Sequence, residues 1–311
     1  MKRKLIVKIL GFSTLFLIMV FIFFPVNNLK GYIFERVYSQ SGILLVPESI
    51  YFTLFGLPGV GMKNVGVTLP LGDQELDLWS RKVTLRSAFS GFFPPLPGVS
   101  LNITDLKKGG DIYTKIGKGL NSVAFNLEMN QVNLEQIGPR NGASPLKGLV
   151  DIDSDIHLNE TDVSKSSGYF NVKIKNMMVT QQNVSPPDPA MAAFSFIIPA
   201  MNIGQLNGAL TMKNGLLEIS QFKFGEEPSS DFKGSLNGDF KIEKSFEQST
   251  LNIALRLKLS ERILQNPDAK TFISFLSSYQ TSPGEYGLKW NATVSDFTNF
   301  SIKAIPERLN N

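Results

Sequence analysis

Apolar and polar residues alternate along most of the chain, most clearly between residues 204 and 260. From Phe232 to Glu243, one parity is largely apolar or glycine, and the other carries Lys, Ser, Asn, Asp and Glu. From Thr250 to Leu259, every second position is leucine or isoleucine. Because successive side chains of a strand point to opposite faces, each stretch is expected to form a strand with one apolar face and one wet face. The residues expected to form this apolar face include Phe232, Leu236, Phe240, Leu251, Ile253, Leu255 and Leu257.

The same kind of alternation extends the strand pattern in both directions. Asn214-Gly215 lies between two such runs, 206–212 and 216–224, which is typical of a tight hairpin. Further strands are expected at 50–54, 65–69, 75–78, 82–86, 123–130, 150–158, 170–175, 286–294 and 300–305. No long alternation of strands with helices appears, which argues against a parallel doubly wound sheet. The predicted fold class is mainly β, with a large, mostly antiparallel curved sheet.

Few helices are available to cover the apolar face of this sheet. A short amphipathic helix is expected at 28–38, and another helix at 268–279, where Phe272, Phe275 and Leu276 recur at helical spacing. Either the sheet folds over itself as a sandwich or barrel, or it stays an open trough whose apolar face meets lipid or protein. The sequence leaves both alternatives open.

The N-terminus has the pattern of a membrane anchor. Lys2, Arg3, Lys4 and Lys8 precede an uncharged apolar run, and the 20 residues from 5 to 24 would span roughly 30 Å as a helix, the thickness of a hydrocarbon core. A cleaved signal peptide is disfavoured because no small-residue cleavage triplet follows. We expect a cytoplasmic basic tail at 1–8, a single transmembrane helix at 9–25 and an exported remainder, following the positive-inside rule.

Charge and cysteine content exclude several classes of function. The net charge of +4 equals the four basic residues among the first eight, so the rest of the chain is balanced and nucleic acid is not an expected partner. The absence of cysteine excludes disulfides, thiolate metal sites and a cysteine nucleophile. A single histidine, His157, leaves little room for histidine-based catalysis.

Individual motifs do not indicate catalysis or metal binding. Asp151, Asp153 and Asp155 resemble the start of a calcium loop, but Ile156 and Asp162 stand where that loop needs Gly and Glu, so we interpret the aspartates as a solvated strand face. The glycine-rich segment 56–66 lacks the spacing of a phosphate loop. We expect no catalytic, cofactor-binding or metal-binding residues and no enzyme; an exported hydrolase is the least favoured alternative.

The proline-rich segment 184–189 divides the exported part into two regions. We place the first β region at 26–189 and the second at 190–311, with one continuous domain as the alternative.

The order of these features resembles the type II secretion system protein N family (GspN). The anchor ends in Phe24-Pro25, and four segments carry the resemblance: LPGVGMKNVGV at 57–67, VTLRSAFSG at 83–91, IGQLNGALTMKNGLLEI at 203–219 and FKGSLNGDF at 232–240. The resemblance implies a single-pass protein of the bacterial inner membrane, with a cytoplasmic N-terminus and a periplasmic β domain. It also implies a non-enzymatic accessory role in a type II secretion apparatus, through contacts with other inner-membrane components. The family has no catalytic residues to carry over.

Similar glycine-and-leucine strand patterns occur in the AsmA-like envelope proteins. This more distant similarity implies a second function, the binding or transfer of lipid along an apolar β-groove. The partners would then be phospholipid acyl chains, held by the apolar face of the sheet.

Overall fold

The described strands form one long antiparallel sheet and a separate two-stranded ribbon. The computed structural model describes residues 31, 34–35, 38–39, 44–53, 59–71, 74–90, 96–136, 144–184, 196–243, 245–298 and 305–309. The strands in this part of the chain are β1 (Leu44–Thr53), β2 (Gly59–Leu71), β3 (Gln74–Ser90), β4 (Leu96–Leu106), β5 (Asp111–Lys118), β6 (Ser122–Asn133), β7 (Leu146–Asn159), β8 (Ser167–Val179), β9 (Gln182–Val184), β10 (Phe196–Ile198), β11 (Met201–Lys213), β12 (Leu216–Phe224), β13 (Phe232–Lys241), β14 (Thr250–Leu259), β15 (Gln280–Ser282), β16 (Glu285–Thr293) and β17 (Glu307–Arg308).

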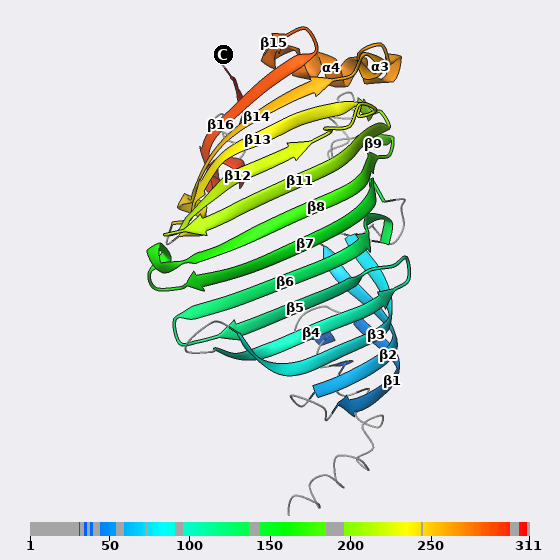
Figure 1. Cartoon of the computed structure of the whole chain (residues 1–311), viewed down its shortest axis with the longest axis vertical. Helices are drawn as coiled ribbons and strands as arrows, with labels where there is room; N and C mark the ends of the chain where they lie inside the picture. The colour runs from blue at the N-terminus through cyan, green and yellow to red at the C-terminus, as the bar shows by residue number, and fades with distance from the viewer. Residues whose placement is uncertain are drawn as a thin grey trace, which may run out of the picture.

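Fifteen of these strands belong to a single sheet, whose neighbours follow the order of the chain up to β14 and then continue through β16 to β15. Strands β9 and β10 form a separate two-stranded ribbon, and β8 pairs directly with β11 across that insertion. Figure 1 shows the strands from β4 to β16 side by side in a broad twisted surface, with β1 to β3 curling away at the N-terminal end. The expected mainly β, antiparallel architecture is confirmed, and the sheet is open.

The helices are short. Those with described bounds are α3 (Glu261–Leu264), α4 (Lys270–Leu276) and α5 (Val294–Thr298), with 3₁₀ turns at Pro267–Ala269 and Ser277–Tyr279 on either side of α4. Residues 31, 34–35 and 38–39 are helical too, and the rest of the helix expected at 28–38 lies outside the described residues. The helix expected at 268–279 is therefore present as a helix with a 3₁₀ turn at each end. Ser260 caps α3 by accepting a hydrogen bond from the Ile263 N–H. Figure 1 places α3 and α4 together at the C-terminal end of the sheet.

The predicted transmembrane segment, 9–25, lies outside the described residues. Among the helices that the structure does describe, none has the length and apolar character needed to cross a membrane.

Strand register places the apolar residues on one face, as the alternation predicts. Directly opposed residues of an antiparallel pair share a face. Leu236 of β13 is opposite Leu255 of β14, which is opposite Leu288 of β16. Their sequence neighbours, such as Arg256, lie on the other, polar face.

Bulges interrupt the alternation in several strands. In β6, Met129 is opposite Ile152 and Val132 is opposite Val150, so the register shifts by one residue between them. Gln131, in the left-handed region at φ 49°, supplies the extra residue. Its backbone N–H donates to Asp151 Oδ1 at 2.7 Å. Such a bulge bends a strand and lets apolar residues of both parities reach the same core.

Two hydrophobic cores form on the apolar side. The first gathers buried residues of β1 to β7, including Val65, Val132 and Val150. The second joins Leu257, Leu259, Tyr286 and Leu288 of β14 and β16 to Ile263 of α3 and Leu276 of α4.

Candidate functional site

The apolar face between and beside the two cores is open to solvent. Leu85, Val99, Ile116 and Leu158 belong to this face and keep 41%, 48%, 43% and 39% of their surface exposed. Large apolar side chains at this exposure are costly to keep in water unless something covers them. The surface therefore qualifies as a candidate binding site.

Strand register organises this surface into two cross-strand rows. The first row runs over ten strands, through Val99, Ile116, Phe125, Ile156, Gly168, Met212, Leu217, Phe240, Leu251 and Ala292. The second runs beside it, through Leu85, Leu101, Thr114, Leu127, Ser154, Phe170, Leu210, Ile219, Gly238, Ile253 and Trp290. We call these two rows together the open apolar surface.

The open apolar surface offers almost no hydrogen-bonding groups. Neither row contains a charged residue, and the only side-chain hydroxyls belong to Thr114 and Ser154. Both are already used, because Thr114 Oγ1 donates to the Asn126 carbonyl at 3.0 Å and Ser154 Oγ to the Leu127 carbonyl at 3.3 Å. The indole N–H of Trp290, at the end of the second row, is the remaining side-chain donor of the two rows, so a ligand lying along them would meet mostly hydrocarbon.

The seven residues predicted for the apolar face do lie on it, but they divide into two groups. Leu257 is 6% exposed inside the second core, and Leu255 and Phe232 pack at its margin. Phe232 stacks on Phe224 with ring centroids 5.3 Å apart.

The other four predicted residues lie away from that core. Leu236, Phe240, Leu251 and Ile253 are half-buried and belong to neither core. Three of them, Phe240, Leu251 and Ile253, are members of the open apolar surface. Sequence alternation identified the face but not which part of it is covered.

A buried carboxylate, that of Asp231, holds α3 against the C-terminal end of the sheet. We call α3 and α4, which pack on the second core, the helical cover. Asp231, 4% exposed, precedes β13 and accepts hydrogen bonds from the Asn202 N–H at 2.8 Å, Ser260 Oγ at 3.0 Å and Arg262 Nε at 2.7 Å. It therefore links β11 and β13 to the start of α3. Burial alone would raise the pKa of Asp231, but the hydrogen bonds from Arg262, Asn202 and Ser260 outweigh it and hold this pKa below its usual value.

The aspartates of β7 lie on the polar face, as interpreted from the sequence, and each has a partner. Asp151 is 3.2 Å from Lys175 Nζ, Asp153 accepts from the Tyr169 hydroxyl at 3.2 Å, and Asp155 is 3.3 Å from His157 Nε2. In the described ranges, no group of three or more acidic or histidine side chains is placed to hold a metal ion. The aspartates thus act as cross-strand and local partners on a solvated face.

Comparisons of this chain with protein-family models, with curated proteins and with solved structures found no match.

Proposed function

We propose that this protein binds the acyl chains of a phospholipid along the open apolar surface. The observation that carries the proposal is a continuous apolar face, on which Leu85, Val99 and Ile116 are more than 40% exposed and whose only side-chain hydroxyls are committed to the backbone. Such a surface favours hydrocarbon over a polar ligand, because a polar ligand would bury groups that find no hydrogen-bond partner. This is the function implied by the similarity to AsmA-like envelope proteins.

The size of the surface suits this ligand. With strands about 4.8 Å apart, a row crossing ten strands extends over roughly 43 Å. One leaflet of a bilayer contributes about 15 Å of hydrocarbon thickness, half of the roughly 30 Å core. A row is therefore longer than one acyl chain, and chains could occupy successive positions along it.

The accessory role in type II secretion, implied by the resemblance to the GspN family, stays a separate prediction. Protein interfaces are depleted of charged residues at their centres. The polar face of this sheet carries many charges, such as those of Asp151 and Lys175. The geometry therefore favours the apolar face as the working surface.

The test is native mass spectrometry of the full-length protein, extracted in mild detergent from its own membranes. We expect phospholipid to remain bound. The double variant Val99→Asn with Ile116→Asn should lose most of it, because both side chains lie in the first row and are about half exposed. Their exposure also means that the substitutions should cost little folding free energy.

The matched control is Lys213→Asn with Glu218→Asn, two exposed positions on β11 and β12. It should retain lipid at the wild-type level. Wild-type protein that carries no phospholipid, or equal retention by both double variants, would refute the acyl-chain proposal. Co-purifying secretion components in place of lipid would support the accessory role.

A further inference from the structure

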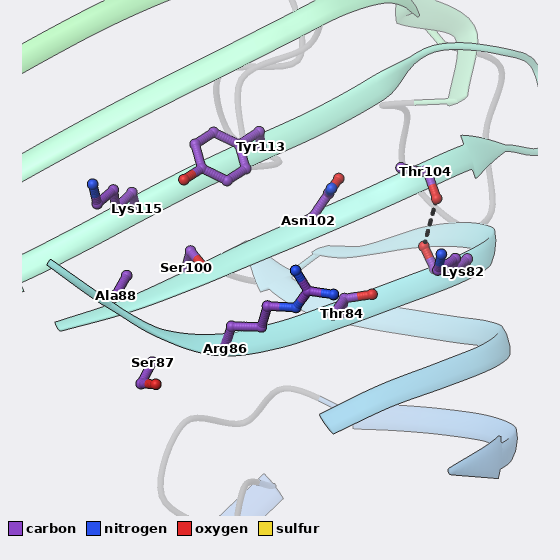
Figure 2. A pocket seen from close by; sticks show the side chains of 10 residues that line it. All are labelled: Lys82, Thr84, Arg86, Ser87, Ala88, Ser100, Asn102, Thr104, Tyr113 and Lys115. Carbon is purple, nitrogen blue, oxygen red and sulfur yellow. Dashed lines mark hydrogen bonds between the residues drawn. The ribbon is translucent and has the colours of Figure 1, made fainter. Parts of the chain in front are cut away.

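The polar face of the sheet has a basic hollow over β3, β4 and β5. The hollow encloses about 420 Å³, and Lys82, Arg86 and Lys115 line it together with neutral residues that include Ser100, Asn102 and Tyr113. None of the described residues that line it is acidic. Figure 2 shows Ser100 between Arg86 and Lys115, with Asn102 and Tyr113 along the next part of the hollow.

Strand register explains how the cations come together. Arg86 of β3 is opposite Ser100 of β4, and Ser100 is opposite Lys115 of β5. Arg86 and Lys115 therefore occupy one cross-strand row, about 10 Å apart at their Cα atoms, with a small residue between them. In the adjacent row, Asn102 is opposite Tyr113. Two cationic side chains can thus reach over a serine toward one small ligand.

The cationic groups of the hollow are not neutralised within the described part of the chain. Lys175, on the same polar face, pairs with Asp151 at 3.2 Å. Lys82, Arg86 and Lys115 have no such carboxylate partner among the described residues. Arg86 Nε is buried and has no hydrogen-bond partner in the described ranges, which is a costly arrangement for a charged donor. Within the part of the chain that the structure describes, the hollow therefore lacks an acceptor that carries negative charge.

We propose that this basic hollow binds a phosphate group, with Arg86 and Lys115 as its principal ligands. The planar guanidinium matches two phosphate oxygens, and a lysine adds a compact positive charge. Asn102, Tyr113 and Ser100 supply neutral donors around the same space. The phosphate is either the headgroup of a phospholipid at a membrane surface or a free phosphate ion.

The phosphate site is independent of the acyl-chain site. Arg86 and Lys115 lie on the polar face, whereas their sequence neighbours Leu85 and Ile116 belong to the open apolar surface on the other side. Variants of one face therefore leave the other face intact, and either proposal can fail alone.

Isothermal titration of the full-length protein in neutral detergent tests the site with two probes, inorganic phosphate and short-chain dihexanoylphosphatidylglycerol. We expect saturable binding of at least one probe. Arg86→Gln and Lys115→Gln should each raise its dissociation constant about tenfold, since each removes a charged hydrogen bond. Lys213→Gln, an exposed lysine outside the hollow, is the matched control and should leave the constant unchanged.

A substitution at Glu128 should have the opposite effect on the dissociation constant, because it removes a negative charge instead of a positive one. Glu128 is opposite Tyr113 on the polar face, so its charge lies about one Debye length from the centre of the hollow. Glu128→Gln should lower the dissociation constant about twofold. Circular dichroism of each variant checks that the sheet is retained, and Lys115→Gln serves if Arg86→Gln fails to fold.

Each outcome of the titrations either identifies the ligand of the basic hollow or refutes the proposal. Binding of both probes with loss in the hollow variants identifies the phosphate itself as the ligand. Binding of the phospholipid alone, again weakened in these variants, identifies a lipid headgroup. No saturable binding of either probe, or equal weakening in Lys213→Gln, would overturn the proposal, whatever the acyl-chain experiment shows.

Discussion

The two ends of β14 show how one apolar pattern serves two purposes. Leu251 and Ile253, near its start, are half-buried and belong to the open apolar surface. Leu257 and Leu259, near its end, are 6% and 3% exposed because Ile263 of α3 and Leu276 of α4 cover them. The strand pattern is the same, so it is the cover that turns an apolar face into a core. Where the cover is absent, the same residues are available for a ligand.

The largest expected difference is between two leucines of this strand. Leu257→Ala should cost about 3 kcal/mol of unfolding free energy, because it leaves a cavity in a closed core. Leu251→Ala should cost about 1 kcal/mol, because solvent or ligand can fill the space. Urea denaturation followed by circular dichroism measures both. Equal losses would mean that the start of β14 is covered as firmly as its end.

The next largest effect on the free energy of unfolding is expected at Asp231, which holds the helical cover on the sheet. Asp231→Asn should destabilise the C-terminal end by about 2 kcal/mol, since it removes the charge that Arg262 and two other donors bind. The pKa of Asp231 is lowered in the folded protein. Its contribution is therefore present above the unfolded pKa, about 3.9, and is lost as the pH falls through the lower folded value.

This pH dependence distinguishes the loss of the ionised Asp231 carboxylate from a packing defect that has nothing to do with its charge. In Asp231→Asn, the fall of stability with acid should become shallower than in the wild type. Gln265→Ala, a change at an exposed position that carries no titratable group, is the control and should keep the wild-type acid dependence. If the acid dependence of stability is unchanged in Asp231→Asn, another carboxylate controls the loss of stability at low pH.

Alternation predicted the two faces of the strands well, because side-chain direction in a strand has a fixed period of two. It identified Leu236 and Leu255 as members of one face, and register places them opposite each other. It could not predict the bulge at Gln131, whose left-handed backbone shifts the parity of β6. Nor does periodicity say where α3 and α4 dock, since that depends on contacts between distant segments.

The basic hollow was also beyond sequence reasoning. Lys82 and Arg86 share a parity on β3, but nothing in the chain indicates that Lys115 lies beside them. Their approach follows from the register of three strands, which brings Arg86 and Lys115 to the two sides of Ser100. A search for cations of matching parity on consecutive strands could have suggested the cluster, but only with the register known.

The smallest expected effect comes from the polar face of β14 itself. Arg256 is exposed and lies opposite Ser235 and Gly287, so Arg256→Asp should change the unfolding free energy by no more than about 0.5 kcal/mol. It should also leave phospholipid retention unchanged, because the side chain is on the face opposite Leu255. Urea denaturation and native mass spectrometry measure the two quantities on one preparation. A loss comparable to that of Leu257→Ala would mean that something covers the polar face too, and the contrast between a covered end and an open end of one face would no longer explain where ligands bind.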